Sequence, residues 1–345
     1  MEHPARELAR QLAARAEAVC RYYLSNGVKC GRWWCVGDVH NTPGRSMYVR
    51  LHGSACGTRP AGKWTDAAQP GEHGDLLDLI ALNRGCRSLT ETMAEARRFL
   101  GGTPLPSPNR DAPPLGRSSR SPAERAQRLF RAARPIAGTP AEAYLRARGI
   151  TQTRFWCLRY HDGVYYRDHD GAPLQRLPAW LAAVTDLDGR IVAVHRTWID
   201  PRTASIAPLF KPKRALGEFL GAAVRFGAAT ESLIAGEGLE TVLSLKSACP
   251  ELPMAAGLSA NHLAGLLLPP TLKRLWVALD EGDAGARAGA ALCARAAVQG
   301  VDARDIAPLR DDFNTDLQTL GHARFTARVR ALLAEELARV AAPPP

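Results

Sequence analysis

The sequence lacks any long apolar run. No stretch of about 18 uninterrupted apolar residues occurs in its 345 residues, which excludes a membrane span. The first twenty residues carry Arg, Glu and His throughout and contain no apolar segment of the kind that secretory signals need. The only Gly-Lys pair, Gly62-Lys63, precedes Trp64, so the phosphate-binding motif GxxxxGK[ST] is also absent.

The sequence also lacks the cysteine pattern of a disulfide-stapled protein. Its eight cysteines are scattered over 345 residues, and a chain of this length buries sizeable cores without disulfides. The length suggests two or three domains, and a composition of 46% hydrophobic and 23% charged residues is that of an ordinary soluble protein. We therefore expect a cytoplasmic protein.

Acidic residues are scarce in the middle of the chain. Residues 1–100 carry 14 Lys and Arg against 10 Asp and Glu, a net charge of +4. Residues 101–225 carry 20 against 10, a net of +10, and residues 226–345 carry 11 against 14, a net of −3. This segregation suits a protein that grips a polyanion and holds metal ions with carboxylates. The alternative is that the arginine excess reflects an Arg-rich and Ala-rich proteome.

A proline-rich segment divides the chain. Residues 101–122 contain six prolines with Gly and Ser between them, which predicts an exposed connector. We expect a small domain over residues 1–100, a basic mixed α+β domain over 123–228, an α/β domain over 229–322 and a C-terminal helix and tail over 323–345. Thr139 and Pro140 predict the start of a helix, with Thr139 as its cap.

Short apolar runs alternate with helical patterns after residue 230. The predicted strands are 232–236, 254–258, 274–280 and 302–307, and the predicted helices are 239–247, 261–268 and 284–299. Strands that alternate with helices predict a doubly wound parallel sheet, so the fold class is α/β here and α+β for the chain as a whole. Functional groups in such sheets collect beyond the carboxyl ends of the strands.

Acidic residues follow three of these predicted strands. Glu237 follows the first, Asp280 the third, and Asp312 lies in the segment after the fourth. Clustered carboxylates repel one another unless cations lie between them, and their hard oxygen atoms favour Mg²⁺ or Mn²⁺. The alternative is that each acidic residue simply caps the helix that follows it.

Three runs of sequence carry a family resemblance. IAGEGLET, LWVALDEGDAGARAG and DDFNTDL resemble the Toprim domain, the metal-dependent catalytic fold of bacterial-type primases, type IA and type II topoisomerases and some nucleases. The resemblance implies that Glu237 is a general acid/base, that Asp280 holds metal ions and that Asp312 is the third acidic position. The family's second motif has a further Asp where this chain has Gly282, so Asp283, or alternatively Glu281, would have to replace it.

Residues 20–80 resemble the zinc-binding domain of primases in outline. Cys35 and His40 stand near the first ligand pair, whereas Trp64 and Thr65 occupy the positions of the second. Four zinc ligands would require Cys30 and Cys56 to converge with Cys35 and His40. The alternative, which we favour, is a ribbon that has lost its zinc and keeps small buried thiols.

Basic and aromatic side chains are interleaved in the first domain, and basic residues are clustered in the second. Bases stack on aromatic rings while cations follow the phosphate backbone, so this composition favours nucleic acid. The second cluster resembles parts found upstream of Toprim in plasmid- and phage-type primases. The predicted nucleic-acid- or nucleotide-binding residues are Arg45, Lys63, Trp64, Arg196, Lys211, Lys213 and Arg214.

The resemblance implies a primase-like protein that makes short primers on a single-stranded DNA template from nucleoside triphosphates, for the replication of DNA such as that of a mobile element. Mg²⁺ or Mn²⁺ would be held by Asp280, Asp283 and Asp312, and a replicative helicase would be a separate partner. One alternative is a Toprim nuclease or topoisomerase-like enzyme, although all seven tyrosines precede residue 167, which disfavours a separate strand-cleaving domain. Another is a catalytically inactive DNA-binding accessory protein.

Overall fold

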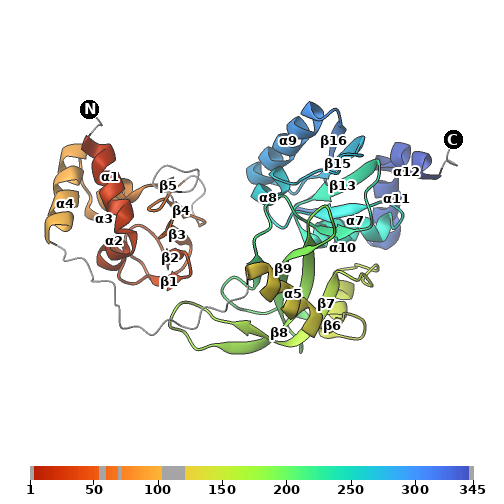
Figure 1. Cartoon of the computed structure of the whole chain (residues 1–345), viewed down its shortest axis with the longest axis horizontal. Helices are drawn as coiled ribbons and strands as arrows, with labels where there is room; N and C mark the ends of the chain where they lie inside the picture. The colour runs from red at the N-terminus through yellow and green to blue at the C-terminus, as the bar shows by residue number, and fades with distance from the viewer. Residues whose placement is uncertain (1–3, 54–59, 69–71, 103–120, 342–345) are drawn as a thin grey trace. The chain divides into compact units, whose positions relative to one another are not determined.

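A computed structural model describes residues 4–53, 60–68, 72–102 and 121–341 (Figure 1). The chain forms two compact units, Met1–Gly116 with Arg167–Leu174, and Arg117–Tyr166 with Gln175–Pro345. Most of the predicted connector over 101–122 lies outside the described residues. The candidate zinc ligand Cys56 also lies outside them. Among the helices of the described ranges, none is both long and apolar enough to cross a membrane.

The first unit places helices beside a small antiparallel sheet. The helices are α1 (Pro4–Ala14), α2 (Ala16–Tyr23), α3 (Leu76–Arg84) and α4 (Leu89–Gly102). The strands follow one another in chain order as β1 (Val28–Cys30), β2 (Trp33–Val36), β3 (Met47–Arg50), β4 (Trp64–Asp66) and β5 (His73–Gly74). Asp75 begins α3 with a reciprocal capping box to Asp78, and Gly85 ends it in the left-handed conformation that glycine adopts without strain. The core includes Trp34 and Met47.

The second unit begins with an antiparallel sheet in the order β10-β9-β8-β7-β6, with β11 also paired to β9. The strands are β6 (Arg134–Pro135), β7 (Leu158–Tyr166), β8 (Gln175–Thr185), β9 (Ile191–Asp200), β10 (Ser205–Ile206) and β11 (Lys213–Gly217). Two helices accompany them, α5 (Pro122–Ala132) and α6 (Pro140–Ala147). We call this sheet the middle sheet.

Thr139 precedes α6 as predicted, but its side chain does not cap the helix. Proline does occupy the first turn of α6, but the Thr139 hydroxyl donates to the Ile136 carbonyl, 2.5 Å away, instead of capping the helix. The Glu142 carboxylate accepts from the Gly138 amide at 2.8 Å and the Thr153 hydroxyl at 2.9 Å. These hydrogen bonds, together with Arg146, lower the pKa of Glu142 to about 2.

A second sheet follows in the order β12-β14-β13-β15-β16. Its strands are β12 (Val224–Phe226), β13 (Ser232–Gly236), β14 (Met254–Ala256), β15 (Arg274–Ala278) and β16 (Asp302–Ile306). The last four are parallel, which confirms the predicted α/β class, and β12 adds an antiparallel edge. We call this sheet the C-terminal sheet.

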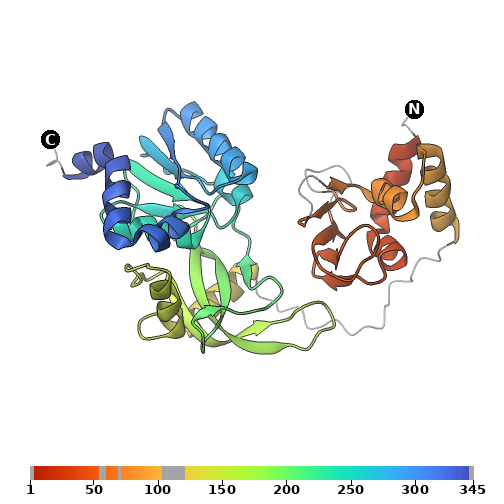
Figure 2. The same ribbon diagram turned by 180° about the vertical axis from the view of Figure 1, so that it is seen from behind.

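Helices cover both faces of the C-terminal sheet (Figures 1 and 2). They are α7 (Leu239–Ala248), α8 (Ala260–Ala264), α9 (Asp283–Val298), α10 (Phe313–Leu320), α11 (His322–Leu332) and α12 (Ala334–Ala341). Adjacent residues of β13 point to opposite faces, so Leu233 and Ala235 join the cluster under α8 and α9 while Ile234 joins the one under α7, α10 and α11. Two predictions are corrected: the helix predicted over 261–268 is a single short turn, and the C-terminal pattern is two helices.

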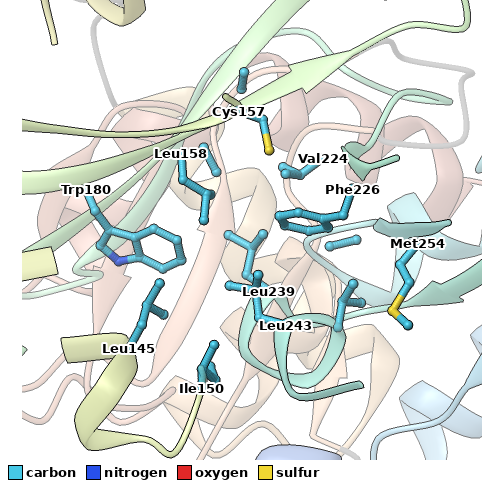
Figure 3. Close-up of a cluster of buried hydrophobic side chains, with 14 of the residues drawn as sticks. Leu145, Ile150, Cys157, Leu158, Trp180, Val224, Phe226, Leu239, Leu243 and Met254 are labelled. Carbon is cyan, nitrogen blue, oxygen red and sulfur yellow. The ribbon is translucent and has the colours of Figure 1, made fainter. Parts of the chain in front are cut away.

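One hydrophobic cluster joins the two sheets of the second unit. Figure 3 shows Trp180 of β8, Leu145 of α6, Phe226 of β12 and Leu243 of α7 pointing into the same cluster. Two hydrogen bonds between the Thr185 and Ala223 backbones also connect β8 to the segment that leads into β12. The middle and C-terminal sheets therefore share a core.

Candidate functional site

Glu237 lies at the carboxyl end of the central strand β13. Gly236 ends this strand where an added Cβ would lie 2.9 Å from Val242 Cγ2, so the turn into α7 requires glycine. The Glu237 carboxylate accepts the Ala260 backbone N–H, and its carbonyl accepts the Leu258 N–H at 2.8 Å. Leu258 has a φ of +72°, a strained conformation for a leucine beside the site. Burial raises the pKa of Glu237.

Asp280 lies at the end of the neighbouring strand β15. The Thr241 hydroxyl of α7 donates to Asp280 Oδ1 at 2.9 Å and fixes the carboxylate. Burial raises the pKa of Asp280, and the negative charges of Glu237 and Asp312 raise it further, to about 6. The hydrogen bond from Thr241 acts in the opposite direction. The charges of the other two predicted carboxylates, Glu237 and Asp312, therefore both act on Asp280.

Asp312 has a local structural role as well as this electrostatic one. It is the residue before α10, and its Oδ1 accepts the Thr315 backbone N–H at 2.6 Å. The capping alternative is thus correct for Asp312, although the residue is also close enough to raise the pKa of Asp280.

The structure gives Asp283 a different environment from the other three acids. Its side chain is 95% exposed in the first turn of α9, 3.8 Å from Arg287. Glu281 is exposed too, and its backbone N–H donates to the Asp311 carbonyl. Neither side chain is among the charges that raise the pKa of Asp280.

Glu237, Asp280 and Asp312 supply hard carboxylate oxygens, the type of ligand that a divalent cation such as Mg²⁺ prefers. Within the described ranges, no group of three or more His, Cys, Asp or Glu side chains converges on one point. Mg²⁺ is usually bound by one or two protein carboxylates, with water and substrate phosphates as the other ligands. The mutual repulsion at Asp280 is the electrostatic environment that such a cation would relieve.

The candidate zinc ligands Cys35 and His40 differ in their exposure to solvent. Cys35 is fully buried within β2, opposite Tyr48 of β3, whereas His40 is exposed in the turn after β2. They are part of no metal-binding group among the described residues, and Cys56 lies outside those residues.

The predicted nucleic-acid residues of the first unit differ in exposure. Trp64 is 3% exposed and its indole N–H donates to the Asp75 carbonyl at 2.8 Å, so it is a core residue that offers no face to a base. Lys63 is exposed, 3.6 Å from Asp75, and Arg45 is half-buried. Trp33 is half-buried and stacks with Arg50, whose Cζ lies 4.3 Å from the ring centre.

The strand register separates the basic residues of the middle sheet. Lys213 is opposite Thr197 and Arg214 is opposite Arg196, so Lys213 and the two arginines point to different faces. Lys213 pairs with Glu240 of α7 at 2.7 Å. Arg196 donates instead to the carbonyls of Ala215 at 3.1 Å and Arg214 at 3.4 Å. Lys211 is exposed before β11, with a φ of +51°.

Glu240 is a site residue that the sequence prediction missed. It is buried, and the hydroxyl of Tyr144 donates to the same Oε1 that pairs with Lys213, also at 2.7 Å. These partners lower its pKa to about 2 against the opposing effect of burial. Its place in the run IAGEGLET was visible, but nothing in the sequence identified Lys213 and Tyr144 as its partners.

His195 lies on the same face of the middle sheet as Lys213. It is buried, its Nδ1 has no hydrogen-bond partner among the described residues, and burial lowers its pKa to about 4. It is therefore a buried neutral histidine with one unsatisfied ring nitrogen.

Two adjacent segments of the chain match family models. Residues 232–323 match the Toprim domain, and residues 120–226 match a domain of unknown function, DUF7146. The Toprim match covers the four parallel strands of the C-terminal sheet with Glu237, Asp280 and Asp312, whereas β12 lies in the other matched segment. No curated protein matches the chain.

Solved primase structures are weakly similar. The zinc-binding and RNA polymerase domains of the Aquifex aeolicus primase share 16% identity, covering 99% of this chain and 90% of that chain, with a TM-score of 0.42. The RNA polymerase domain of the Mycobacterium tuberculosis primase shares 13% (61% and 79% covered, TM-score 0.38). The primase fragment of the bacteriophage T7 primase-helicase shares 15% (46% and 64% covered, TM-score 0.34).

Proposed function

We propose that this chain, whose residues 232–323 form a Toprim domain, is a primase-like nucleotidyltransferase that makes short primers on single-stranded DNA. The observation that carries the proposal is the electrostatic coupling of Asp280 to Glu237 and Asp312 at the carboxyl edge of the C-terminal sheet. These carboxylates fit one or two divalent cations, Mg²⁺ or Mn²⁺, with nucleoside triphosphate phosphates supplying the remaining oxygen ligands.

Each of the three acids has its own role in the proposal. Bound cations would lower the charge on the phosphoryl oxygens and orient the attacking 3′-hydroxyl. Asp280, held by the Thr241 hydroxyl, and Asp312, held by the Thr315 amide, are the fixed carboxylates that would bind them. Glu237 would accept the proton of the attacking hydroxyl, a role favoured by its raised pKa.

The template would be held by basic side chains. Lys211 is exposed two residues before Lys213, which contacts Glu240 of the Toprim segment. Arg214, Arg45 and Lys63 are further proposed contacts, and a replicative helicase would be a separate protein. Trp64 is left out because it is buried.

The exposure of Asp283 favours one alternative. With Gly282 in the family's second Asp position and Asp283 facing solvent, the chain has one carboxylate fewer than the motif at this point. A catalytically inactive DNA-binding accessory protein is the second candidate function for that reason.

Primer synthesis distinguishes the two functions. The full chain is incubated with a single-stranded template, labelled nucleoside triphosphates and Mg²⁺ or Mn²⁺, and the products are separated by length. We expect Glu237→Gln and Asp280→Asn to lose product and Asp283→Asn to keep most of it. The matched control is Glu231→Gln, an exposed acid just before the opposite end of β13. If the wild type yields no product while it still binds DNA, the accessory function is correct.

A further inference from the structure

A cavity of about 380 Å³ lies between α5 and the middle sheet. Its lining residues come from α5, β7, β8, β9 and β11, which are all within the segment that matches the domain of unknown function. Its volume is in the range of small-molecule sites. Its charged, imidazole and aromatic lining residues are Arg125, Arg128, Arg176, Arg196, His161 and Tyr165.

The lining of the cavity carries positive charges that no acidic residue of the described lining balances. Four arginines line it, and none of its described lining residues is acidic. Arg125, Arg128 and Arg176 are exposed, whereas Arg196 is half-buried and donates to the backbone carbonyls of Arg214 and Ala215. Burial, with a smaller effect of Arg214, lowers the pKa of Arg196 to about 10. A desolvated guanidinium without a carboxylate is the environment that an anionic ligand would stabilise.

A β-bulge shapes one wall of this cavity. The register of β7 against β8 shifts between His161 and Val164, and the Gly163 N–H donates to His161 Nδ1 at 3.0 Å. Because Nδ1 accepts this hydrogen bond, the proton of the neutral ring is on Nε2, which makes Nε2 a donor. An added Cβ at Gly163 would lie 3.2 Å from Arg176 Nε, so glycine lets this guanidinium approach the bulge.

The other walls of the cavity are apolar. Leu129 of α5, the buried Val164 of β7 and Leu216 of β11 line it, and Tyr165 is 60% exposed beside it. The Arg176 Cζ is 5.8 Å from the Tyr165 ring centre. An apolar floor with an exposed aromatic ring suits a nucleobase, whereas the surrounding arginines suit its phosphates.

We propose that this cavity binds a nucleoside phosphate at a site separate from the carboxylates of the Toprim segment. Arg196 and Leu216 lie on the face of the middle sheet that carries α5, whereas Lys213 lies on the face that meets α7. The sheet therefore separates Arg196 and Leu216 from Lys213 and from the face that contacts α7. The ligand is a free nucleotide or one nucleotide of a single strand, which share this chemistry.

The test measures binding without catalysis. Fluorescent mant-ATP and a fluorescein-labelled oligonucleotide of about 20 thymidines are titrated separately into the full chain in EDTA, which removes the divalent cations that the carboxylates would need. We expect Arg128→Ser to weaken binding of the probe that uses the cavity about tenfold, because a hydrogen bond to a charged group contributes about 1.5 kcal/mol or more. The matched control is Arg131→Ser, on the same helix but not in the cavity lining, with at most a twofold effect.

Two further variants make the result decisive. Gly163→Ala displaces Arg176 without changing charge, so we expect it to weaken the same probe. Asp280→Asn, which should abolish primer synthesis, is expected to leave binding in EDTA unchanged, so this proposal and the proposed function can fail independently. If Arg128→Ser weakens binding of mant-ATP, the ligand is a free nucleotide. If it weakens binding of the oligonucleotide, the ligand is a nucleotide of a single strand. If neither probe binds, or if Arg131→Ser weakens binding as much as Arg128→Ser, the proposal is wrong.

Discussion

The ion pair between Lys213 and the buried Glu240 gives the sharpest prediction. The Glu240 side chain is 9% exposed and that of Lys213 is 41% exposed, with 2.7 Å between Nζ and Oε1. At an effective dielectric constant of about 20, the attraction at this distance is about 6 kcal/mol before desolvation is subtracted. A pKa lowered from 4.5 to about 2 corresponds to a net stabilisation of about 3 kcal/mol, shared with Tyr144.

Lys213→Met should therefore destabilise the second unit by about 2 kcal/mol at pH 7, because it leaves a buried carboxylate with Tyr144 as its main partner. Glu240→Leu in the same chain should restore part of this loss, since no charge then remains buried. The pH dependence has a fixed sign. A lowered carboxyl pKa stabilises the fold fully above about 4.5, and this stabilisation is lost as the pH falls towards 2.

Hydrogen exchange in urea measures this effect in the full chain. Peptides from β9, β11 and α7 report the unfolding free energy of the region around the pair. The matched control is Lys273→Met, which breaks an exposed pair with Glu231 and should cost about 0.5 kcal/mol or less. If Lys213→Met costs no more than this control but strongly weakens DNA binding, then Lys213 is a nucleic-acid contact and not a structural one.

Three other predictions follow from buried polar groups. Asp280→Asn should raise the unfolding free energy in EDTA by up to about 3 kcal/mol at pH 7.5 and little at pH 4, because a carboxyl pKa raised from 3.8 to about 6 destabilises the fold progressively as the pH rises between these two values. Wild type should lose up to about 3 kcal/mol relative to His195→Gln between pH 6.5 and 4, since the lowered pKa of His195 opposes its protonation in the fold. Asn314→Ala should cost about 2–3 kcal/mol in urea unfolding, because the buried Asn314 amide bonds Ser244 and both the carbonyl and the side chain of Arg148.

The sequence predicted the C-terminal sheet well because its signals are local. Short buried runs such as 232–236 alternate with helical patterns, and glycines mark the turns after β13 and β15. The carboxyl ends of parallel strands meet at one edge, so the coupling of Glu237, Asp280 and Asp312 follows from strand order alone.

What the sequence did not predict depends on contacts between distant segments. Lys213 and Glu240 are 27 residues apart, and only the register of β11 against β9 turns Lys213 towards α7 and Arg214 away from it. The burial of Trp64 likewise depends on its packing in the core of the first unit and on the Asp75 carbonyl that accepts its N–H. A pattern of basic and aromatic residues cannot reveal either outcome.

The strand β12 limits how freely the Toprim segment can be exchanged between proteins. It lies in the segment matched by the domain of unknown function, yet it pairs with β14 as the edge of the C-terminal sheet, and its Phe226 fills the core shared by both segments. A recombination event that cut the chain between residues 226 and 232 would leave β14 as a bare edge, open to pairing with other chains. The two family segments therefore share one sheet and one core, and we expect a fragment that begins at residue 232 to aggregate.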